Sequence, residues 1–564
     1  MRLDANIRIC GEAGQGVQTT GGLLIGALAA AGLHVFGTQS YMSRIRGGAN
    51  SFDIRISDAE LFSGRESAEV LVALTAEALE HFRAGAGAGA VLVFDGDAAG
   101  DGILSLPLSA AAKEAGGSAQ MVNTVAAGAV LELLGYDAAP LRAVLAEEFK
   151  KKGDEVVARN LACIERGARL VAGRRASVRA PRPGQPSGTV LSGSETVGLG
   201  AAAAGVKLVA SYPMTPSTGV FTWLAGAADE YGIVVEQAED EIAAINMVIG
   251  AVYAGVPAMT TTSGGGFSLM CEGLSLAGML ELPAVVMDSQ RPGPATGLPT
   301  RTGQEDLKMV VHAGHGEFPR AVYAPGSPEE GYRLIRQALA TAHRFQTPVI
   351  LLLDQFLADQ QKNIAPPPAE PDPIDRCIEP RPAADYRRYA VTESGISPLT
   401  YPGLGKAEVH VDSDEHDEEG HITEDPGVRV AMVEKRMKKL ASLKSDALKP
   451  TLFGPADAGT FLICWGSNKL IVKEARERLA AKGKSVAALH FRQVYPLTME
   501  MISGCGLEGK RLIGVENNAT GQFSQLLRRE LGLTVPERIL KYDGTCFTVE
   551  EVCREAEKIM EGRG

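Results

Sequence analysis

The sequence predicts an α/β protein built from three α/β units. Short apolar runs of strand length alternate with Ala-rich helical segments, and Gly-rich turns follow several of these runs. The chain has 564 residues, which is long enough for about three domains at roughly 100–200 residues each. Strands that alternate with helices form parallel sheets covered by helices.

The first unit is expected at residues 1–172. An apolar strand at 7–10 leads through the turn Gly11-Glu-Ala-Gly-Gln-Gly16 into a helix of small residues at 20–31. Further strands of this unit are expected at 34–36, 51–56 and 91–94. Residues 173–190 contain four Arg, three Pro and three Gly, a composition typical of a linker.

The second unit is expected at 191–360 and the third at 453–564. The second is predicted to have strands at 208–212, 233–236, 258–262, 284–287 and 349–353. The third is predicted to have strands at 460–465, 485–490 and 511–515, with a helix at 473–482. Between the two units, residues 361–452 join a Pro-rich start, an acidic run and a basic helical end. This composition predicts an extended, exposed insertion rather than a compact domain.

Charge and cysteine content exclude several classes of protein. The net charge is −12, from 56 basic and 68 acidic residues, which argues against a nucleic-acid binder. The eight cysteines form no C-x-x-C pair, so neither a disulfide framework nor a Cys-ligated cluster is expected. The N-terminus has no apolar signal segment, and Gly interrupts the longer apolar runs. We therefore expect a cytoplasmic protein without a membrane span.

The turn Gly11-x-x-Gly14-x-Gly16 lies between a strand and a helix. Glycines there allow a ligand to approach the backbone, and a helix N-terminus favours an anion. No acidic residue closes the following strand, so the dinucleotide fingerprint is incomplete. Two hypotheses stay open for this turn: a tight βα connection without ligand, and a nucleotide-binding domain.

Several strand ends of the second unit carry polar, sharply turned segments. They are Tyr212-Pro-Met-Thr-Pro-Ser-Thr218, Glu239-Asp-Glu-Ile-Ala-Ala-Ile-Asn246, Thr260-Thr-Thr-Ser-Gly-Gly-Gly-Phe-Ser-Leu-Met270 and the segment from Met287 to Arg301. Ligands of open α/β sheets bind at the carboxyl ends of strands, so these segments predict one site. Two of them also have a structural interpretation. Ser217 or Thr218 is suited to a helix N-cap, and acids in a first helical turn are stabilised by the helix dipole.

The run Asp412-Ser-Asp-Glu-His416-Asp-Glu-Glu-Gly-His421 offers oxygen and nitrogen ligands for a cation. The spacing of an EF-hand is absent, and no third histidine lies near. We therefore expect a solvated loop and no metal site in this chain.

The motifs together resemble the α subunit of 2-oxoacid:ferredoxin oxidoreductases, and most closely the 2-oxoglutarate type. The resemblance rests on YPMTPS, QAEDEIAAIN, TSGGGFSLMCE and QRPGPATGLPTRT. GEAGQG and RIRGGANSFDIRIS resemble the γ subunit of that family, fused here ahead of α. The third unit, with Tyr495-Pro-Leu and Glu516-Asn-Asn-Ala-Thr-Gly-Gln522, resembles its transketolase C-terminal-like domain. Small substitutions at Ala13 and Gly265 depart from the family pattern.

The resemblance implies CoA-dependent oxidative decarboxylation of a 2-oxoacid on thiamine diphosphate, with reduction of ferredoxin. The α chain would hold the aminopyrimidine half of the cofactor in a pyrimidine-type domain at 191–360. Glu241, rather than Glu239, matches the glutamate that hydrogen-bonds the ring. A carboxyl that shares a proton needs an apolar setting, which Ile242 and Ile245 are expected to supply.

By motif position the donors to the substrate's carboxylate and keto oxygen are Thr215, Arg291 and Thr300. Arg301 is a second candidate cation, and for Arg291 a structural salt bridge is the alternative. The distal carboxylate of 2-oxoglutarate is expected to meet Arg301 or the γ-like loop with Ser43, Arg44 and Arg46. The further cofactor-binding candidates are Tyr212, Pro213, Ser263 and Gly264.

The two later units carry no Gly-Asp-Gly motif with a trailing Asn, and the cysteines are not clustered. The resemblance therefore implies a β subunit that provides Mg²⁺, the diphosphate site and a 4Fe–4S cluster, in an (αβ)₂ heterotetramer. One alternative keeps the enzyme class with pyruvate or a branched-chain 2-oxoacid as substrate. A second alternative is a non-catalytic nucleotide-binding regulatory subunit.

Overall fold

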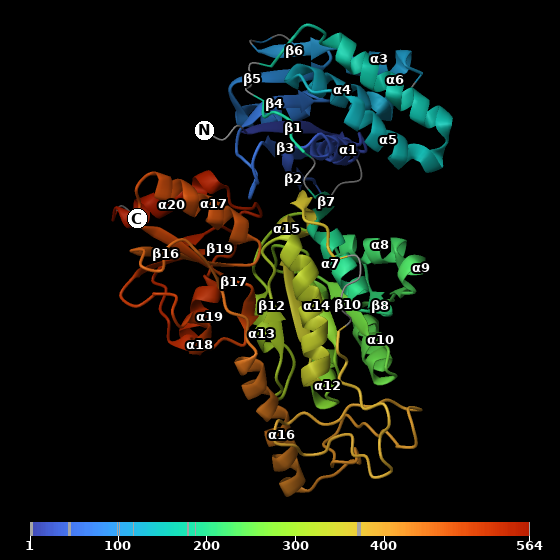
Figure 1. The fold of residues 1–564 in the computed structure, drawn as a ribbon, viewed down its shortest axis with the longest axis vertical. Helices are drawn as coiled ribbons and strands as arrows, with labels where there is room; N and C mark the ends of the chain where they lie inside the picture. The colour runs from blue at the N-terminus through green and yellow to red at the C-terminus, as the bar shows by residue number, and fades with distance from the viewer. Residues whose placement is uncertain are drawn as a thin grey trace. The chain divides into compact units, whose positions relative to one another are not determined.

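A computed structural model describes residues 4–42, 47–98, 100, 102–116, 118–176, 180–185, 188–368 and 374–562. The chain divides into two compact units (Figure 1). The first comprises Met1–Ser192, Asp359–Pro366 and Thr548–Glu550. The second comprises Gly193–Ala358, Pro367–Phe547 and Glu551–Gly564. The α/β class predicted from the sequence is confirmed, while the exact limits of the predicted domains stay a prediction.

The first unit contains an eight-stranded sheet in the order β6-β5-β4-β1-β3-β2-β14-β7. Its strands are β1 Asp4–Ala13, β2 His34–Ser40, β3 Gly47–Ser57, β4 Ala68–Ala73, β5 Ala86–Asp95, β6 Ile103–Leu106, β7 Thr189–Ser192 and β14 Gln361–Ile364. The expectation of a purely parallel sheet is wrong, because β1, β2, β3, β14 and β7 pair antiparallel. Too few residues separate β2 from β3 for the crossover that parallel strands need.

Helices cover this first sheet. They are α1 Val17–Ala30, α2 Ala76–Phe82, α3 Leu108–Glu114, α4 Val122–Leu134, α5 Ala139–Phe149 and α6 Asp154–Leu170. The Gly turn predicted before α1 is present, and Gly14 and Gly16 have positive φ angles of 89° and 73°. Glycine adopts this backbone region without a steric cost, which explains how the strand turns so sharply into the helix.

The second unit contains a seven-stranded sheet in the order β18-β12-β13-β11-β10-β8-β9. Its strands are β8 Leu208–Ser211, β9 Val234–Gln237, β10 Ala258–Thr262, β11 Val285–Gln290, β12 Ala321–Tyr323, β13 Val349–Asp354 and β18 Gln493–Tyr495. All are parallel except β18. The five strands expected here are present within three residues, whereas the short β12 and β18 were not predicted.

Apolar side chains on the two faces of this sheet enter different cores. One face packs under α10, α12 and α13, and the other under α7, α8 and α14. The helices are α7 Gly193–Ala203, α8 Thr218–Gly226, α9 Ala228–Tyr231, α10 Glu241–Tyr253, α11 Gly264–Leu269, α12 Cys271–Met279, α13 Leu307–His312, α14 Pro328–Phe345, α15 Gln355–Asp359 and α16 Pro426–Ser445. Because both faces are buried, the strands are almost continuously apolar until their carboxyl ends.

A five-stranded sheet, β15-β17-β16-β19-β20, forms the C-terminal part of the second unit. Its elements are β15 Thr451–Phe453, β16 Thr460–Trp465, β17 Val486–Phe491, β19 Arg511–Glu516 and β20 Glu537–Leu540, with α17 Asn468–Ala481, α18 Met499–Ile502, α19 Gln522–Leu531 and α20 Val549–Met560. The three predicted strands and the predicted helix of this part are present.

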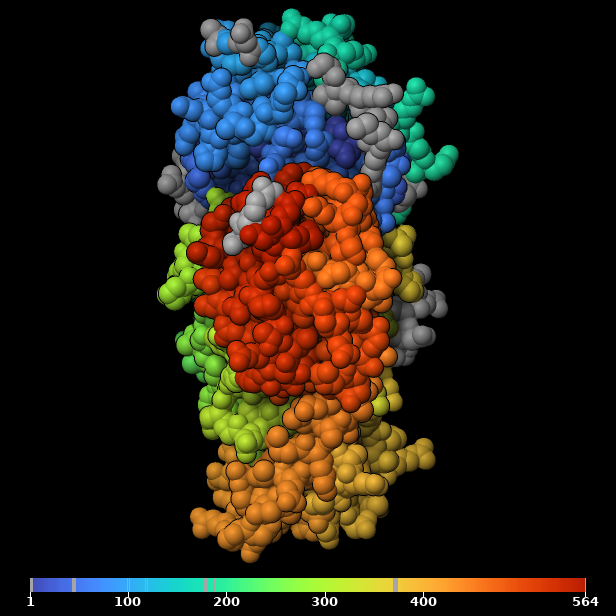
Figure 2. Space-filling view, turned by 90° about the vertical axis from the view of Figure 1, so that its left-hand side faces the viewer, coloured from blue at the N-terminus to red at the C-terminus, as the bar shows by residue number. Residues whose placement is uncertain are grey.

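Residues 374–450 are more compact than the sequence predicted. Figure 2 shows them as one packed lobe, in gold and orange. Arg388, Tyr389 and His416 are buried inside it, against α16 on which Lys435 and Lys439 lie. The predicted basic helix is present, but some of its charges face inward. The reason is a buried partner, Glu281, at the end of α12.

Glu281 links this lobe to the part of the unit that contains the seven-stranded sheet. Its carboxylate accepts hydrogen bonds of 2.7 and 2.8 Å from Lys435 Nζ and also pairs with Lys439. All three side chains are at most 1% exposed. Burial alone would raise the pKa of Glu281, but Lys439, Lys435 and Arg388 hold it well below its usual value.

Within the described residues, no helix combines the length and apolar character needed to cross a membrane.

We predict that Glu281→Gln destabilises the second unit by about 3–5 kcal/mol, because it leaves two buried ammonium groups without a carboxylate. The measurement is urea unfolding followed by circular dichroism. Glu393→Gln, on the exposed surface of the same lobe, is the matched control and should leave the unfolding midpoint unchanged. Equal midpoints for the two variants would contradict an anchoring role for Glu281.

Candidate active site

The carboxyl ends of β8, β10 and β11 meet at one edge of the seven-stranded sheet. These strands are parallel neighbours, with Met259 of β10 paired to Val209 of β8 and Thr262 of β10 paired to Asp288 of β11. The segments that follow them, together with residues 239–246 after the neighbouring parallel strand β9, were predicted to form a site. Their convergence at one edge follows from the parallel pairing.

Three adjacent acids at the start of α10 have three different environments. Glu239 is exposed. Asp240 is the N-cap, and its side chain accepts a 2.7 Å hydrogen bond from the backbone N–H of Ala243. Glu241 is only 3% exposed. Asp240 therefore caps the helix, and Glu241 lies in its first turn, where the structural interpretation placed an acid.

The carboxylate of Glu241 lies against the glycine turn that follows β10. A Cβ atom on Gly266 would contact both Thr262 Oγ1 and Glu241 Oε1, so only glycine fits between them. Among the described residues no donor reaches the buried Oε1 of Glu241. A buried carboxylate oxygen without a partner is costly, and a ligand that shares a proton with it would remove that cost.

The apolar setting expected around Glu241 is formed only in part. Ile245 is buried at 1% exposure, as expected, but Ile242 is 50% exposed. The two residues are three positions apart, yet Ile242 lies on the outer side of the first helical turn. Thr262 and the glycine turn occupy the position that we expected Ile242 to take.

Arg291 and Thr215 are brought together from two different strand ends. Arg291 Nη1 donates a 2.6 Å hydrogen bond to the carbonyl oxygen of Thr215. Burial lowers the pKa of Arg291, while nearby Asp306 opposes that change. The Thr215 hydroxyl has no hydrogen bond within the described part of the chain. This hydroxyl and the remaining guanidinium N–H groups can donate hydrogen bonds to a ligand.

The loop after β8 does not use Ser217 as a cap. Ser217 stands at the N-cap position of α8, but its side chain makes no capping hydrogen bond. Its Oγ donates instead to the carbonyl oxygen of Met214, at 2.7 Å. Earlier in the same loop, Tyr212 is 40% exposed and Pro213 is exposed.

The other predicted cofactor-binding residues lie on the turn into α11. Ser263 is fully buried at the N-cap position, and its hydroxyl has no partner among the described residues. A Cβ on Gly264 would contact the carboxylate of Asp306. The turn therefore lies between two acids, Glu241 on one side and Asp306 on the other.

Thr300 and Arg301 lie further along the loop that follows β11. Thr300 is half-buried, and no hydrogen bond joins it to Thr215 or Arg291 within the described residues. The Cβ and Cγ of Arg301 lie against Gly544. Ser43, Arg44 and Arg46 fall outside the described residues, so their part in a site stays a prediction.

Sequence reasoning missed two acids at this edge. Asp288 is fully buried on β11, and no donor within the described chain reaches either of its carboxylate oxygens. Burial and nearby Asp306 raise the pKa of Asp288 well above its usual value. Burial and Glu305 raise the pKa of Asp306 to about 7, against the opposing effect of Arg291. An aspartate inside an apolar strand was the signal available in the sequence.

Gln304 was also missed, and it fixes the loop that carries Arg291. Its backbone N–H donates to the carbonyl of Asn517 at 2.7 Å, and its Oε1 accepts from Asn468 Nδ2 at 2.9 Å. Gln522 Nε2 donates to the carbonyl of Glu305 at 2.7 Å. Asn517 and Gln522 belong to the ENNATGQ motif, so this motif positions the loop.

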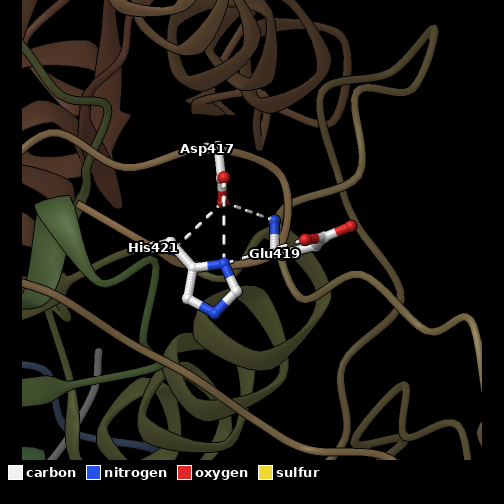
Figure 3. Close-up of side chains that lie close together, drawn as sticks. All are labelled: Asp417, Glu419 and His421. Carbon is white, nitrogen blue, oxygen red and sulfur yellow. Dashed lines mark hydrogen bonds and ion pairs between the residues drawn. The ribbon is translucent and has the colours of Figure 1, made fainter. Parts of the chain in front are cut away.

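The acidic run of the lobe brings Asp417, Glu419 and His421 together (Figure 3). One ligand atom from each lies within 4.8 Å of the others. The Asp417 carboxylate already accepts hydrogen bonds from the backbone N–H groups of Glu419 and His421. Glu419 and His421 are exposed. The expected absence of a metal here stays a prediction.

The edge therefore holds a buried carboxylate with an unpartnered oxygen, one cation and several hydroxyl groups. Such a set can bind an anion at Arg291 and exchange a proton at Glu241. The described residues at the edge belong to one unit, so the set does not depend on the placement of the other.

Comparisons with known proteins agree with this arrangement. Residues 199–435 match the family described as pyruvate flavodoxin/ferredoxin oxidoreductase, thiamine diphosphate-binding. Residues 6–170 match the family described as pyruvate ferredoxin/flavodoxin oxidoreductase. The first match contains all the residues of this edge described above, except those that belong to the C-terminal sheet.

Individual relatives match over nearly the whole chain. The α subunit of 2-oxoacid:ferredoxin oxidoreductase 2 from Aeropyrum pernix is 31% identical, over 99% of this chain and 98% of its own length. The 2-oxoglutarate oxidoreductase subunit KorA from Mycobacterium tuberculosis is 28% identical, over 99% and 92%. The 2-oxoglutarate:ferredoxin oxidoreductase of Magnetococcus marinus, solved with 2-oxoglutarate, coenzyme A and succinyl-CoA, superposes with a TM-score of 0.91 and 33% identity, over 99% of this chain and 100% of that one.

We predict that Gly266→Ala lowers the free energy of unfolding by about 1–3 kcal/mol, because the new methyl group overlaps Thr262 and Glu241. Gly265→Ala, one residue earlier, is the matched control, since nothing lies within 4 Å of its Cβ position. Thermal unfolding of the two variants tests the difference. A control that is destabilised as much as Gly266→Ala would refute the close packing of this turn.

Proposed function

Because the chain belongs to the 2-oxoacid:ferredoxin oxidoreductase family as an α subunit, we propose that it provides the aminopyrimidine half of a thiamine diphosphate site. The proposed reaction is the CoA-dependent oxidative decarboxylation of 2-oxoglutarate to succinyl-CoA, with reduction of ferredoxin. The observation that carries the proposal is Glu241, a buried carboxylate whose Oε1 has no partner among the described residues.

The residues around Glu241 fit the cofactor that the family match implies. The orphaned oxygen offers an acceptor for a ring N–H, and Gly266 lets the Glu241 carboxylate lie directly against the turn. Ser263, Gly264, Tyr212 and Pro213 are the proposed further contacts. Thiamine diphosphate supplies a carbanion-stabilising thiazolium when bound. The chain's part is to hold a proton at Glu241 Oε1 and to exclude water from it.

Arg291 and Thr215 are proposed to bind the carboxylate and keto oxygen of the substrate, with Thr300 as a third donor. The guanidinium is held in place by the Thr215 carbonyl, so its remaining N–H groups are fixed toward the edge. The choice of 2-oxoglutarate is supported by the relatives named for that substrate. We propose Arg301, with Ser43, Arg44 and Arg46, as donors to its distal carboxylate.

A β subunit is the proposed partner, because relatives that span this chain are named as subunits. It would hold Mg²⁺, the cofactor's diphosphate and a 4Fe–4S cluster, none of which has a motif in the two later units. An (αβ)₂ assembly and a cytoplasmic location are part of the same proposal. The hypothesis of a regulatory nucleotide-binding subunit is not carried forward, since relatives over 99% of the chain are named as oxidoreductase subunits.

We predict that Glu241→Gln in the αβ complex lowers kcat at least about a thousandfold without loss of assembly. The amide keeps the shape of the side chain but cannot exchange the proton. Glu239→Gln is the matched control, because Glu239 is exposed on the same turn. Reduction of a viologen dye with 2-oxoglutarate measures both. Near-normal turnover of Glu241→Gln would remove this residue from the proposed site.

The substrate is tested by kcat/KM of the αβ complex for 2-oxoglutarate, pyruvate and 2-oxoisovalerate. A charge-assisted contact to the distal carboxylate predicts a preference for 2-oxoglutarate of about ten- to a hundredfold. The α chain alone should show no turnover. Preference for pyruvate or the branched acid would assign the enzyme to the alternative substrate and leave the half-site proposal intact.

A further inference from the structure

Asp288 and Asp306 lie at the same sheet edge as Glu241, near enough for Asp306 to affect the pKa of Asp288. Asp288 and Gln290 are two residues apart on β11, so their side chains lie on the same face. Gln290 Oε1 accepts a 3.1 Å hydrogen bond from the backbone N–H of Asp306. This bond holds the start of α13 over the face from which Asp288 projects.

The pair has too few donors to carry two negative charges. Neither oxygen of Asp288, nor Oδ2 of Asp306, has a hydrogen-bond partner among the described residues. Two carboxylates that share a buried site cannot both ionise near neutral pH. At least one of the pair therefore holds a proton, and the fully buried Asp288 is that one.

Asp306 is the member that can exchange a proton with the site. Its carboxylate lies against Gly264, on the opposite side of the glycine turn from Glu241. The charged groups that face it are Asp288 on β11, Arg291 and Glu305 on the loop, and Glu241 beyond the turn. Of these groups, Arg291 carries the charge opposite in sign to that of the Asp306 carboxylate.

We propose that Asp306, paired with neutral Asp288, competes with the substrate's carboxylate for Arg291 and takes up a proton when the 2-oxoacid binds. This inference rests on the proposed function, in which Arg291 binds the substrate. Asp306 is a positioning residue in this scheme. It sets the charge that an incoming anion meets, and it forms no bond to the reacting atoms.

The sign of the pH dependence follows from this arrangement. Burial and Glu305 raise the pKa of Asp306 to about 7, so below about pH 7 its carboxyl group carries no charge that would weaken the attraction of an anion to Arg291. Above that pH the ionised carboxylate attracts Arg291 and repels the substrate. The KM for the 2-oxoacid should therefore rise with pH, and each unit by which substrate raises the pKa of Asp306 is a tenfold change in affinity.

The experiment measures KM and kcat of the αβ complex for 2-oxoglutarate from about pH 6 to about pH 8.5. The wild-type KM is expected to rise about three- to tenfold across this range. In Asp306→Asn the KM should stay flat at the low value. In Asp288→Asn the rise should begin at the wild-type pH, because a neutral amide replaces a carboxyl group that is already protonated, and a shifted onset would contradict a neutral Asp288.

Glu305→Gln is the matched control, since it removes a neighbouring carboxylate and leaves Asp306 in place. It should keep the rise in KM and shift it slightly to lower pH. A structural role for Asp306 would change KM at every pH without removing the dependence. Persistence of the rise in Asp306→Asn, or a flat wild-type profile, would overturn the inference.

A second measurement needs no variant. Calorimetric titration of the complex, free of thiamine diphosphate, with 2-oxoglutarate at about pH 7 in two buffers of different ionisation enthalpy counts the protons taken up on binding. Uptake of a fraction of one proton supports the inference, and zero uptake contradicts it. A wild-type complex inactive toward every 2-oxoacid would instead refute the proposed function.

Discussion

The close approach of backbone and carboxylate at the turn Gly264–Gly266 determines how the rest of the edge is arranged. Parallel pairing of β10 with β11 puts Thr262 beside Asp288, and the chain must then turn at once into α11. Gly266 accommodates Glu241 and Thr262, while Gly264 accommodates Asp306. A side chain at either position would separate the acids from the sheet edge. The turn is thus a spacer with acids on both sides, and its lack of side chains is a structural requirement.

The acids at this edge differ in environment, and therefore in their hydrogen-bond partners. The Asp240 carboxylate accepts a hydrogen bond at the helix N-terminus. Glu241, the next residue, has an oxygen without a hydrogen-bond partner in the described chain. Burial and nearby Asp306 raise the pKa of Asp288, while Arg291 opposes the rise in the pKa of Asp306. Because several acids lie near Arg291, their protonation changes the charge that an anion would meet at this edge.

Much of this organisation could be predicted from the sequence. Strand periodicity located the central strands within a few residues, and the polar segments after β8, β10 and β11 were correctly expected to lie at one edge. The hydrophobic pattern of the sequence could not predict features that depend on which strands pair with one another. The antiparallel half of the first sheet includes β14, more than 300 positions from β2, and the short β12 and β18 carry too little sequence signal. Ile242 shows the same limit at the site. Helical periodicity predicted that it is buried, but it is exposed in the first turn of α10.

Residues that act by holding others were the hardest to predict. Gln304 lies in a loop without periodicity, and its role appears only when the C-terminal sheet places Asn468 and Asn517 around it. The ENNATGQ motif was read from sequence as a mark of that C-terminal domain, and the structure shows it fixing the loop that carries Arg291. Glu516 of the motif accepts hydrogen bonds from the backbone N–H groups of Phe523 and Ser524, which orients α19 and with it Gln522. Within the described residues, Arg291 is the guanidinium that donates a hydrogen bond to Thr215. Its position therefore depends on a sheet that lies some two hundred residues later in the chain. A domain with no candidate site residue of its own thus fixes the loop that carries Arg291.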